Sequence, residues 1–202
     1  MPPMLKLTLL CGALALAGCA SVRLVDSDVQ SFSQLRTLPT TPIYRFERLP
    51  SQQAQSGQQD TIEAQAAQAL AKVGMRLDPQ GPAAYRVQAH ARIDREMPAD
   101  WYDPWWGGGW GPGWGAGFGG WGGRGFYGGL AMRFPPPTLY RREVGLVVRE
   151  AASAAVVYET HAVHEGVWND NPAVFGAMFD AALTGFPTPP AGQRRVNVEI
   201  PR

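Results

Sequence analysis

The sequence predicts an α+β fold, a two-layer sandwich in which two helices cover one face of a mixed sheet of four or five strands, with a long Gly/Trp-rich loop insertion. Three observations lead to this prediction. Five segments alternate apolar and polar residues, which is typical of strands that bury one face. Two segments carry apolar residues at helical period. The first of these helical segments lies between two strands, an order that favours helices packed against a sheet.

The N-terminus has the pattern of a bacterial export signal. Lys6 precedes an apolar run from Leu7 to Ala17, and the tetrad LAGC ends at Cys19. The run is shorter than the ~20 apolar residues that span a bilayer, and small residues before the cysteine suit a cleavage site. We therefore expect residues 1–18 to be a signal peptide. A soluble secreted form is the weaker alternative.

The LAGC tetrad resembles the lipobox of bacterial lipoproteins. This resemblance implies that Cys19 is joined to diacylglycerol and, after cleavage, acylated at its new amino group, with palmitate as the expected acyl group. Three acyl chains would anchor the protein permanently to a membrane. Ala20 stands where an aspartate would signal inner-membrane retention, which favours the outer membrane of a Gram-negative bacterium and a domain that faces the periplasm.

Composition excludes several classes of partner. Loss of the 18-residue signal from the 202 residues leaves 184, which is a suitable length for one domain. The whole chain has 18 basic and 17 acidic residues, and the signal peptide contains one of the basic residues, Lys6. The mature chain therefore has equal numbers of basic and acidic residues. This balance argues against nucleic acid or an anionic lipid surface as the main partner. Cys19 is the one mature cysteine, so no disulfide is expected.

The first elements follow a predicted lipidated tether. Residues 19–41 are expected to form this tether, which starts with a short strand at 22–25, and a single domain is expected at 42–202. IYRFERLP, residues 43–50, alternates and predicts the first strand. Asp60 and Glu63 have the spacing of a capping box, and Gly74 suits the left-handed end of a helix. The apolar stripe of that helix consists of Ile62, Ala66, Ala69, Leu70 and Val73.

The later elements are predicted in the same way. AYRVQAHARID, residues 84–94, alternates and puts His90 on its polar face. Residues 138–150 and 154–166 read as a hairpin, and residues 194–200 alternate as a last strand. Asn171 and Pro172 suit the N-cap and first turn of a second helix. Its apolar stripe consists of Phe175, Met178, Phe179, Ala182 and Leu183.

The insertion, residues 97–137, is predicted to be disordered or loosely ordered. Its segment 101–129 has fourteen glycines and ten aromatic residues, and no period of a helix or strand. One interpretation is a flexible loop whose rings collapse on each other or on the sheet, a tolerated insertion without a partner. The alternative is an aromatic contact surface for sugar rings, lipid or protein. Its candidate residues are Trp101, Trp105, Trp106, Trp110, Trp114 and Trp121.

The position of this insertion relative to the tether can also be predicted. If the strands at 43–50 and 84–94 are parallel, the insertion leaves the sheet at the end opposite to the entry of the lipid tether.

Motifs that resemble catalytic or ligand sites are weak. Gly115, Gly117 and Gly120 match GxGxxG, but the preceding strand and following helix of a nucleotide site are missing. His161, His164 and Glu165 suggest a metal site, yet residues three apart on a strand point to opposite faces and no third ligand is evident. We read them as partly exposed strand-end side chains. No serine elbow or free cysteine nucleophile is present, so we expect no enzyme, no metal and no cofactor.

YRFERLPSQQ, ALAKVGMRL, the Gly/Trp insertion, VVYETHA and FDAALTGFPTPP together resemble the family catalogued as domain of unknown function 4136. The resemblance covers about residues 40–200 and implies an α/β sandwich similar to small periplasmic lipoproteins that assist outer-membrane assembly. It implies no site residue beyond Cys19. We therefore expect a non-enzymatic, lipid-anchored envelope protein that binds or scaffolds an envelope partner. The alternative is binding or processing of peptidoglycan or lipopolysaccharide, with Trp105, Trp106, Trp110 and Trp114 as a stacking platform.

Overall fold

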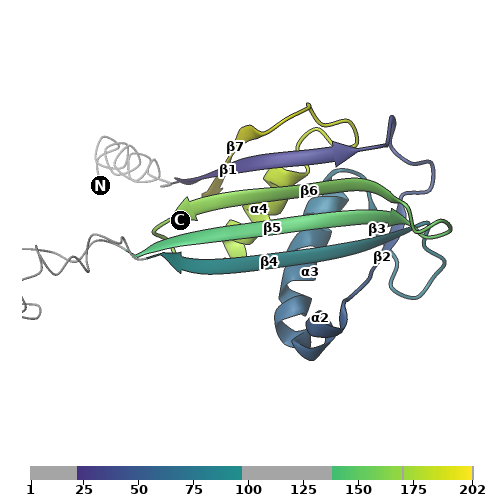
Figure 1. The fold of residues 1–202 in the computed structure, drawn as a ribbon, viewed down its shortest axis with the longest axis horizontal. Coiled ribbons are helices and arrows are strands. Elements are labelled where there is room, and N and C mark those ends of the chain that lie inside the picture. The colour runs from purple at the N-terminus through teal and green to yellow at the C-terminus, as the bar shows by residue number, and fades with distance from the viewer. Residues whose placement is uncertain (1–21, 97–137, 170, 202) are drawn as a thin grey trace, which may run out of the picture.

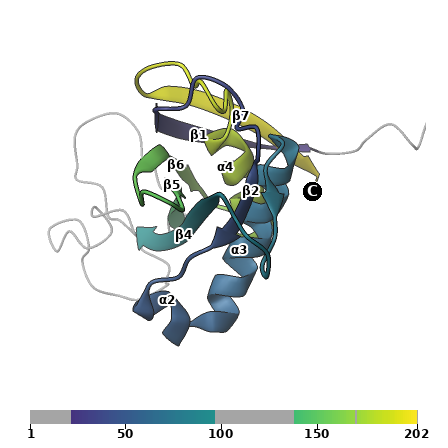
Figure 2. The ribbon, with the colours of Figure 1, turned by 90° about the vertical axis from the view of Figure 1, so that its right-hand side faces the viewer.

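The computed structural model describes residues 22–96, 138–169 and 171–201 (Figure 1). They form one mixed sheet with the strand order β3-β2-β4-β5-β6-β1-β7. The helices α3 and α4 lie on one face of the sheet, which confirms the predicted α+β class and its two-layer arrangement (Figure 2). The elements are β1 (Val22–Ser33), β2 (Ile43–Phe46), α2 (Pro50–Ala54), α3 (Ser56–Lys72), β3 (Arg76–Leu77), β4 (Tyr85–Glu96), β5 (Leu139–Glu150), β6 (Val156–Gly166), α4 (Asn171–Ala182) and β7 (Arg194–Pro201).

The strand β1 corrects the predicted boundary between tether and domain. It runs for twelve residues through the segment predicted as tether, and it pairs antiparallel with β6 on one side and β7 on the other. Every second residue from 25 to 31 is buried: Val25 and Val29 alternate with Ser27 and Ser31. These serines interrupt the apolar alternation in the sequence, which is why only a short strand at 22–25 was predicted. The domain therefore begins at Val22 rather than at residue 42.

The helix α3 begins earlier than predicted. It starts at Ser56, and the short helix α2 precedes it where a loop was expected. Asp60 and Glu63 therefore lie within the helix and do not cap its start. Both carboxylates instead accept hydrogen bonds from Arg48, whose Nη2 lies 2.6 Å from Asp60 Oδ1 and whose Nε lies 2.8 Å from Glu63 Oε1. The predicted left-handed residue after the helix is confirmed, since Gly74 has a φ of +88°.

The sheet is larger than the four or five strands predicted. Besides β1, the additional strand is β3, which is two residues long and thus too short to show an alternating pattern. β3 and β4 both run parallel to β2, as the strand-helix-strand order requires. The other neighbouring strands are antiparallel, including the predicted hairpin of β5 and β6.

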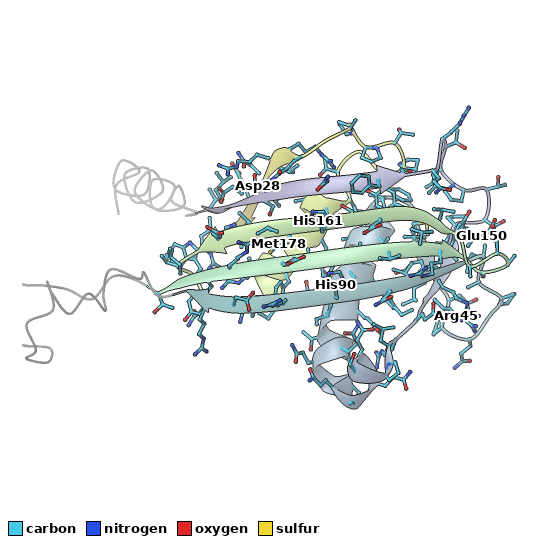
Figure 3. All side chains as sticks on the ribbon, viewed as in Figure 1. Asp28, Arg45, His90, Glu150, His161 and Met178 are labelled. Carbon is cyan, nitrogen blue, oxygen red and sulfur yellow. The ribbon has the colours of Figure 1, made fainter. Side chains whose placement is uncertain are left out.

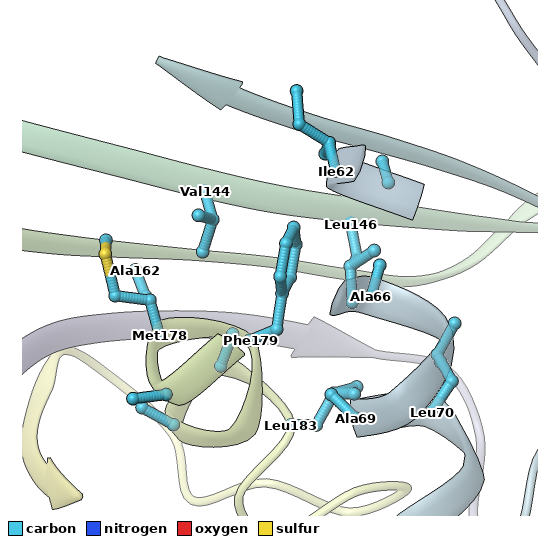
Figure 4. Close-up of a cluster of buried hydrophobic side chains, with 14 of the residues drawn as sticks. Ile62, Ala66, Ala69, Leu70, Val144, Leu146, Ala162, Met178, Phe179 and Leu183 are labelled. Carbon is cyan, nitrogen blue, oxygen red and sulfur yellow. The ribbon is translucent and has the colours of Figure 1, made fainter. Parts of the chain in front are cut away.

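The core lies between the sheet and the two helices (Figure 4). Phe179 of α4 and Leu70 of α3 are fully buried, and Phe179 points toward Val144 and Leu146 of β5. Both predicted apolar stripes therefore face the sheet, although Val73 and Phe175 are only partly buried. Burial of a Leu or Phe side chain contributes about 1.5–3 kcal/mol, so this layer is the main source of stability.

Candidate functional site

Five strand ends meet at one end of the sheet, which we call the insertion end. β4 ends there at Glu96, which pairs with Leu139 at the start of β5. Tyr140 pairs with Gly166 at the end of β6. β1 starts at the same end, because it runs antiparallel to β6, and Val22 pairs with Pro201 at the end of β7. Figure 1 shows the start of β1, the end of β4 and the start of β5 together at the left of the sheet.

This arrangement corrects the predicted position of the insertion. The strands β2 and β4 are parallel, as the prediction assumed. The chain, however, enters the sheet through β1 and not through β2, and β1 runs opposite to β4. The N-terminal segment and the insertion therefore leave the sheet at the same end. Cys19 and the six candidate tryptophans of residues 97–137 lie outside the described residues.

A buried arginine holds the insertion end together. Arg142 lies on the helix-covered face of β5 and is fully buried. Its Nε and Nη2 donate to Asn171 Oδ1 at 3.0 and 2.9 Å, and Nη2 also donates to the carbonyl oxygen of Trp168. The ring of Tyr140 lies 5.2 Å from the guanidinium carbon. Asn171, which we predicted as an N-cap, is the first residue of α4, and its side chain ties α4 to β5.

A second arginine connects β1 to the segment after β6. The guanidinium carbon of Arg23 lies 5.3 Å from the centroid of the Trp168 ring, within the range of a cation–π contact. Trp168 is the one tryptophan outside the insertion, and the residue is 41% exposed. The ring is therefore fixed at the insertion end while part of it faces outward.

The sheet face opposite α3 and α4, which we call the open face, carries polar side chains on β4, β5, β6, β1 and β7. Figure 3 looks onto this face, with His90, His161 and Asp28 labelled in front of the helices. Several of its charged side chains form ion pairs with neighbours: Arg195 Nε lies 3.2 Å from Asp28 Oδ1, and Arg141 Nη1 lies 3.8 Å from Glu165 Oε1. The open face thus has no single sign of charge.

Two histidines flank a glycine at the centre of the open face. Gly145 pairs with His90 on one side and with His161 on the other. A Cβ at position 145 would lie 2.1 Å from His90 Cε1, so the imidazole ring of His90 lies over the glycine. Burial lowers the pKa of His90 below 6.5; nearby Glu143 opposes this shift and His161 adds to it. At neutral pH, His90 is therefore a neutral donor and acceptor.

The third histidine lies on the other face. His164 is 4% exposed, and its Nδ1 lies 2.6 Å from the carbonyl oxygen of Asp26. His161 and His164 thus point to opposite faces of β6, as we predicted, but His164 is buried rather than partly exposed. In residues 22–96, 138–169 and 171–201, no three His, Cys, Asp or Glu side chains come together as a metal site.

Sequence reasoning missed Arg142 and the role of Gly145. Arg142 shares its face with Val144, Leu146 and Val148, so the alternation of β5 already indicated a buried arginine. No such signal exists for Gly145, because its role depends on the pairing of three strands. Of the helices in the described part of the chain, none combines the length and apolar character that crossing a membrane requires.

Comparison with known proteins gives one family and several distant structures. The family model described as Domain of unknown function (DUF4136) matches residues 25–188. The PelC dodecamer from Paraburkholderia phytofirmans is similar at 12% identity and a TM-score of 0.45, over 81% of this chain and 99% of that one. A PDZ domain protein from Parabacteroides distasonis is similar at 12% identity and a TM-score of 0.47, over 94% of this chain and 42% of that one. No curated protein matches significantly in sequence.

Proposed function

The chain belongs to the family described as Domain of unknown function (DUF4136), and from this premise we propose that it is a lipid-anchored envelope protein. It faces the periplasm from the outer membrane and acts as a non-enzymatic binding or scaffolding module. The observation that carries this proposal is the position of Cys19 in the LAGC tetrad, directly before the first strand of the domain.

The short distance between Cys19 and β1 supports a structural role for the anchor. Only Ala20 and Ser21 separate Cys19 from Val22, the first residue of β1. Three residues of extended chain span at most ~11 Å. A lipid on Cys19 would therefore hold the domain at the membrane surface, without the long tether that residues 19–41 were expected to form.

The open face supports a binding role rather than catalysis. Its polar side chains lie on a sheet surface, whereas catalytic groups converge in a concave site that excludes water. Arg92, Arg141 and Arg195 on this face are paired with carboxylates, as Arg195 is with Asp28. A surface of balanced charge does not favour a polyanion such as nucleic acid, so we propose an envelope protein or a glycan as the partner.

Cysteine substitution tests the anchor. We expect Cys19→Ser to abolish incorporation of labelled palmitate and cleavage of the precursor before residue 19. Cys11→Ser is the matched control, because Cys11 lies inside the predicted signal peptide, and it should be processed and retained like the unaltered chain. Equal palmitate incorporation and equal processing of the two variants would contradict the proposal.

A pull-down experiment tests whether the insertion binds a glycan. The unaltered chain and a chain without residues 101–129 are incubated with peptidoglycan and with lipopolysaccharide. Binding that disappears with the deletion supports the stacking platform of Trp105, Trp106, Trp110 and Trp114. Equal binding by both chains would exclude these tryptophans as the glycan-binding surface.

A further inference from the structure

The insertion end carries most of the exposed apolar side chains among the described residues. Ten large apolar side chains are exposed in this part of the chain. Six of them lie at or beside the insertion end: Val22, Leu24, Ile93, Leu139, Val167 and Trp168. Exposed apolar side chains that gather in one place mark a contact surface, whereas isolated ones need no explanation.

Three of these side chains, Leu24, Leu139 and Val167, come from the neighbouring strands β1 and β5 and the end of β6, and they share the open face. Leu139 and Val167 stand directly beside the paired residues Tyr140 and Gly166 of β5 and β6. The register of β1 with β6, in which Asp28 pairs with Val163, places Leu24 beside Val167 on the open face. The contact of Arg23 with the Trp168 ring adds Trp168 at the same end, on the helix-covered side of β1. β5, β6 and β1 are consecutive in the sheet.

The charges around this surface do not favour a polyanionic partner. Arg23, Arg95 and Arg141 stand among the acidic residues Asp94, Glu165 and Glu199. Attraction to an anionic lipid surface needs a cluster of basic residues. An exposed tryptophan beside aliphatic side chains is instead typical of insertion at the interface between headgroups and acyl chains.

The proposed anchor brings this surface to the bilayer. Val22 stays within ~11 Å of Cys19, so lipidation raises the effective concentration of the apolar side chains at the membrane, and weak contacts then suffice to bind. From this geometry we infer that the insertion end docks onto the bilayer that carries the anchor, with Leu24, Leu139, Val167 and Trp168 in the interface. The inference rests on the proposed lipid anchor.

This docking fixes the orientation of the domain. The strands of the sheet rise from the membrane, and the turn between β5 and β6 points away from it (Figure 1). Glu96 and Thr138, which flank the insertion, lie beside the docked surface, so both attachment points of the insertion stay near the lipid.

Spin labels on single cysteines test the inference in the lipidated full chain, reconstituted in vesicles of phosphatidylethanolamine and phosphatidylglycerol. Because Cys19 is the one mature cysteine, Leu139→Cys and Val167→Cys each add one reactive thiol. Leu38→Cys and Leu77→Cys are matched controls, with 46% and 45% exposure against 37% and 47% for Leu139 and Val167. We expect labels at 139 and 167 to collide with oxygen several-fold more than with a water-soluble nickel chelate, and control labels to show the reverse.

Each other outcome overturns the inference in a distinguishable way. Labels at 139 and 167 that collide mainly with the nickel chelate, on vesicle-bound protein, would refute docking and leave the anchor intact. Labels shielded from both reagents would show that protein covers the surface, and spin–spin broadening would identify a second copy. Protein that does not remain with the vesicles would refute the anchor itself, and docking with it.

Discussion

Arg142 is the residue that joins β5, α4 and the segment after β6, since its guanidinium donates to Asn171 Oδ1 and to the carbonyl oxygen of Trp168. We predict that Arg142→Leu lowers the free energy of unfolding by about 2–4 kcal/mol, because it leaves these buried acceptors without charged donors. Urea denaturation measures the change. Arg141→Leu is the control: Arg141 is exposed on the open face, and loss of its ion pair with Glu165 should cost about 0–1 kcal/mol. Equal losses would contradict this role for Arg142.

His90 makes stability depend on pH. Burial lowers its pKa in the folded protein below the ordinary 6.5. Below pH 6.5 the unfolded chain binds a proton that the folded protein takes up only at lower pH, so stability is lost as the pH falls through this window. Acidification from about pH 7.5 to about pH 5.5 should therefore lower the Tm, and less so in His90→Gln.

The His90 ring lies over Gly145, and substitution of this glycine tests whether that position lowers the pKa of His90. The Cβ of Gly145→Ala would lie 2.1 Å from His90 Cε1, so the imidazole must move outward. We expect the His90 pKa to rise towards its ordinary value, as measured by NMR titration of the Cε1 proton. An unchanged His90 titration in Gly145→Ala would show that burial over the glycine is not the cause.

The face on which a single residue lies was predictable from the sequence where it depends on the alternation of one strand. The alternation of β5 puts Arg142 on the buried face, and the alternation of β6 separates His161 from His164. The contact of His90 with Gly145 was not predictable, because it depends on the register between two strands. The predicted capping box of Asp60 and Glu63 was wrong for a similar reason, because both carboxylates bind Arg48, which lies outside the helix.

At the scale of elements, β1 is the strand whose removal should unfold the domain. It lies between β6 and β7, and Val25 and Val29 are buried in it. We expect a chain that begins at residue 42 to show no cooperative thermal transition, because the loss of two strand interfaces exceeds a typical stability of ~5–15 kcal/mol. A chain that begins at residue 20 keeps β1 and should unfold cooperatively. Cooperative unfolding of the shorter chain would show that residues 22–33 are dispensable.

The elements that were predicted correctly have a strong apolar period. The stripes of α3 and α4 and the alternation in β4, β5 and β6 each indicate one buried face. β1 lacks this signal because Ser27 and Ser31 occupy buried positions, where Ser31 Oγ and Thr160 Oγ1 are hydrogen-bonded at 2.8 Å. A polar pair that is satisfied across two strands cannot be recognised in either segment alone.

At the scale of the whole molecule, β1 determines where the N-terminus lies relative to the insertion. A chain that entered through β2 would have its anchor and its insertion at opposite ends of the sheet. Entry through β1 brings Val22, Glu96 and Leu139 to the same end. The orientation of the domain on a membrane thus follows from β1, a strand that the sequence pattern does not reveal in full because two of its buried residues are serines.

The height of the domain above the bilayer tests this orientation most directly. β5 has twelve residues, which at ~3.4 Å per residue separate the two ends of the sheet by roughly 35–40 Å. A fluorophore is attached to the lipidated protein at Ala152→Cys, in the turn after β5, or at Val167→Cys. Energy transfer from each fluorophore to acceptors in the bilayer measures the height of that position. We expect the label at 167 to lie at the bilayer surface and the label at 152 to lie roughly 30–40 Å above it. Equal heights, or a label at 152 nearer to the bilayer, would contradict this orientation.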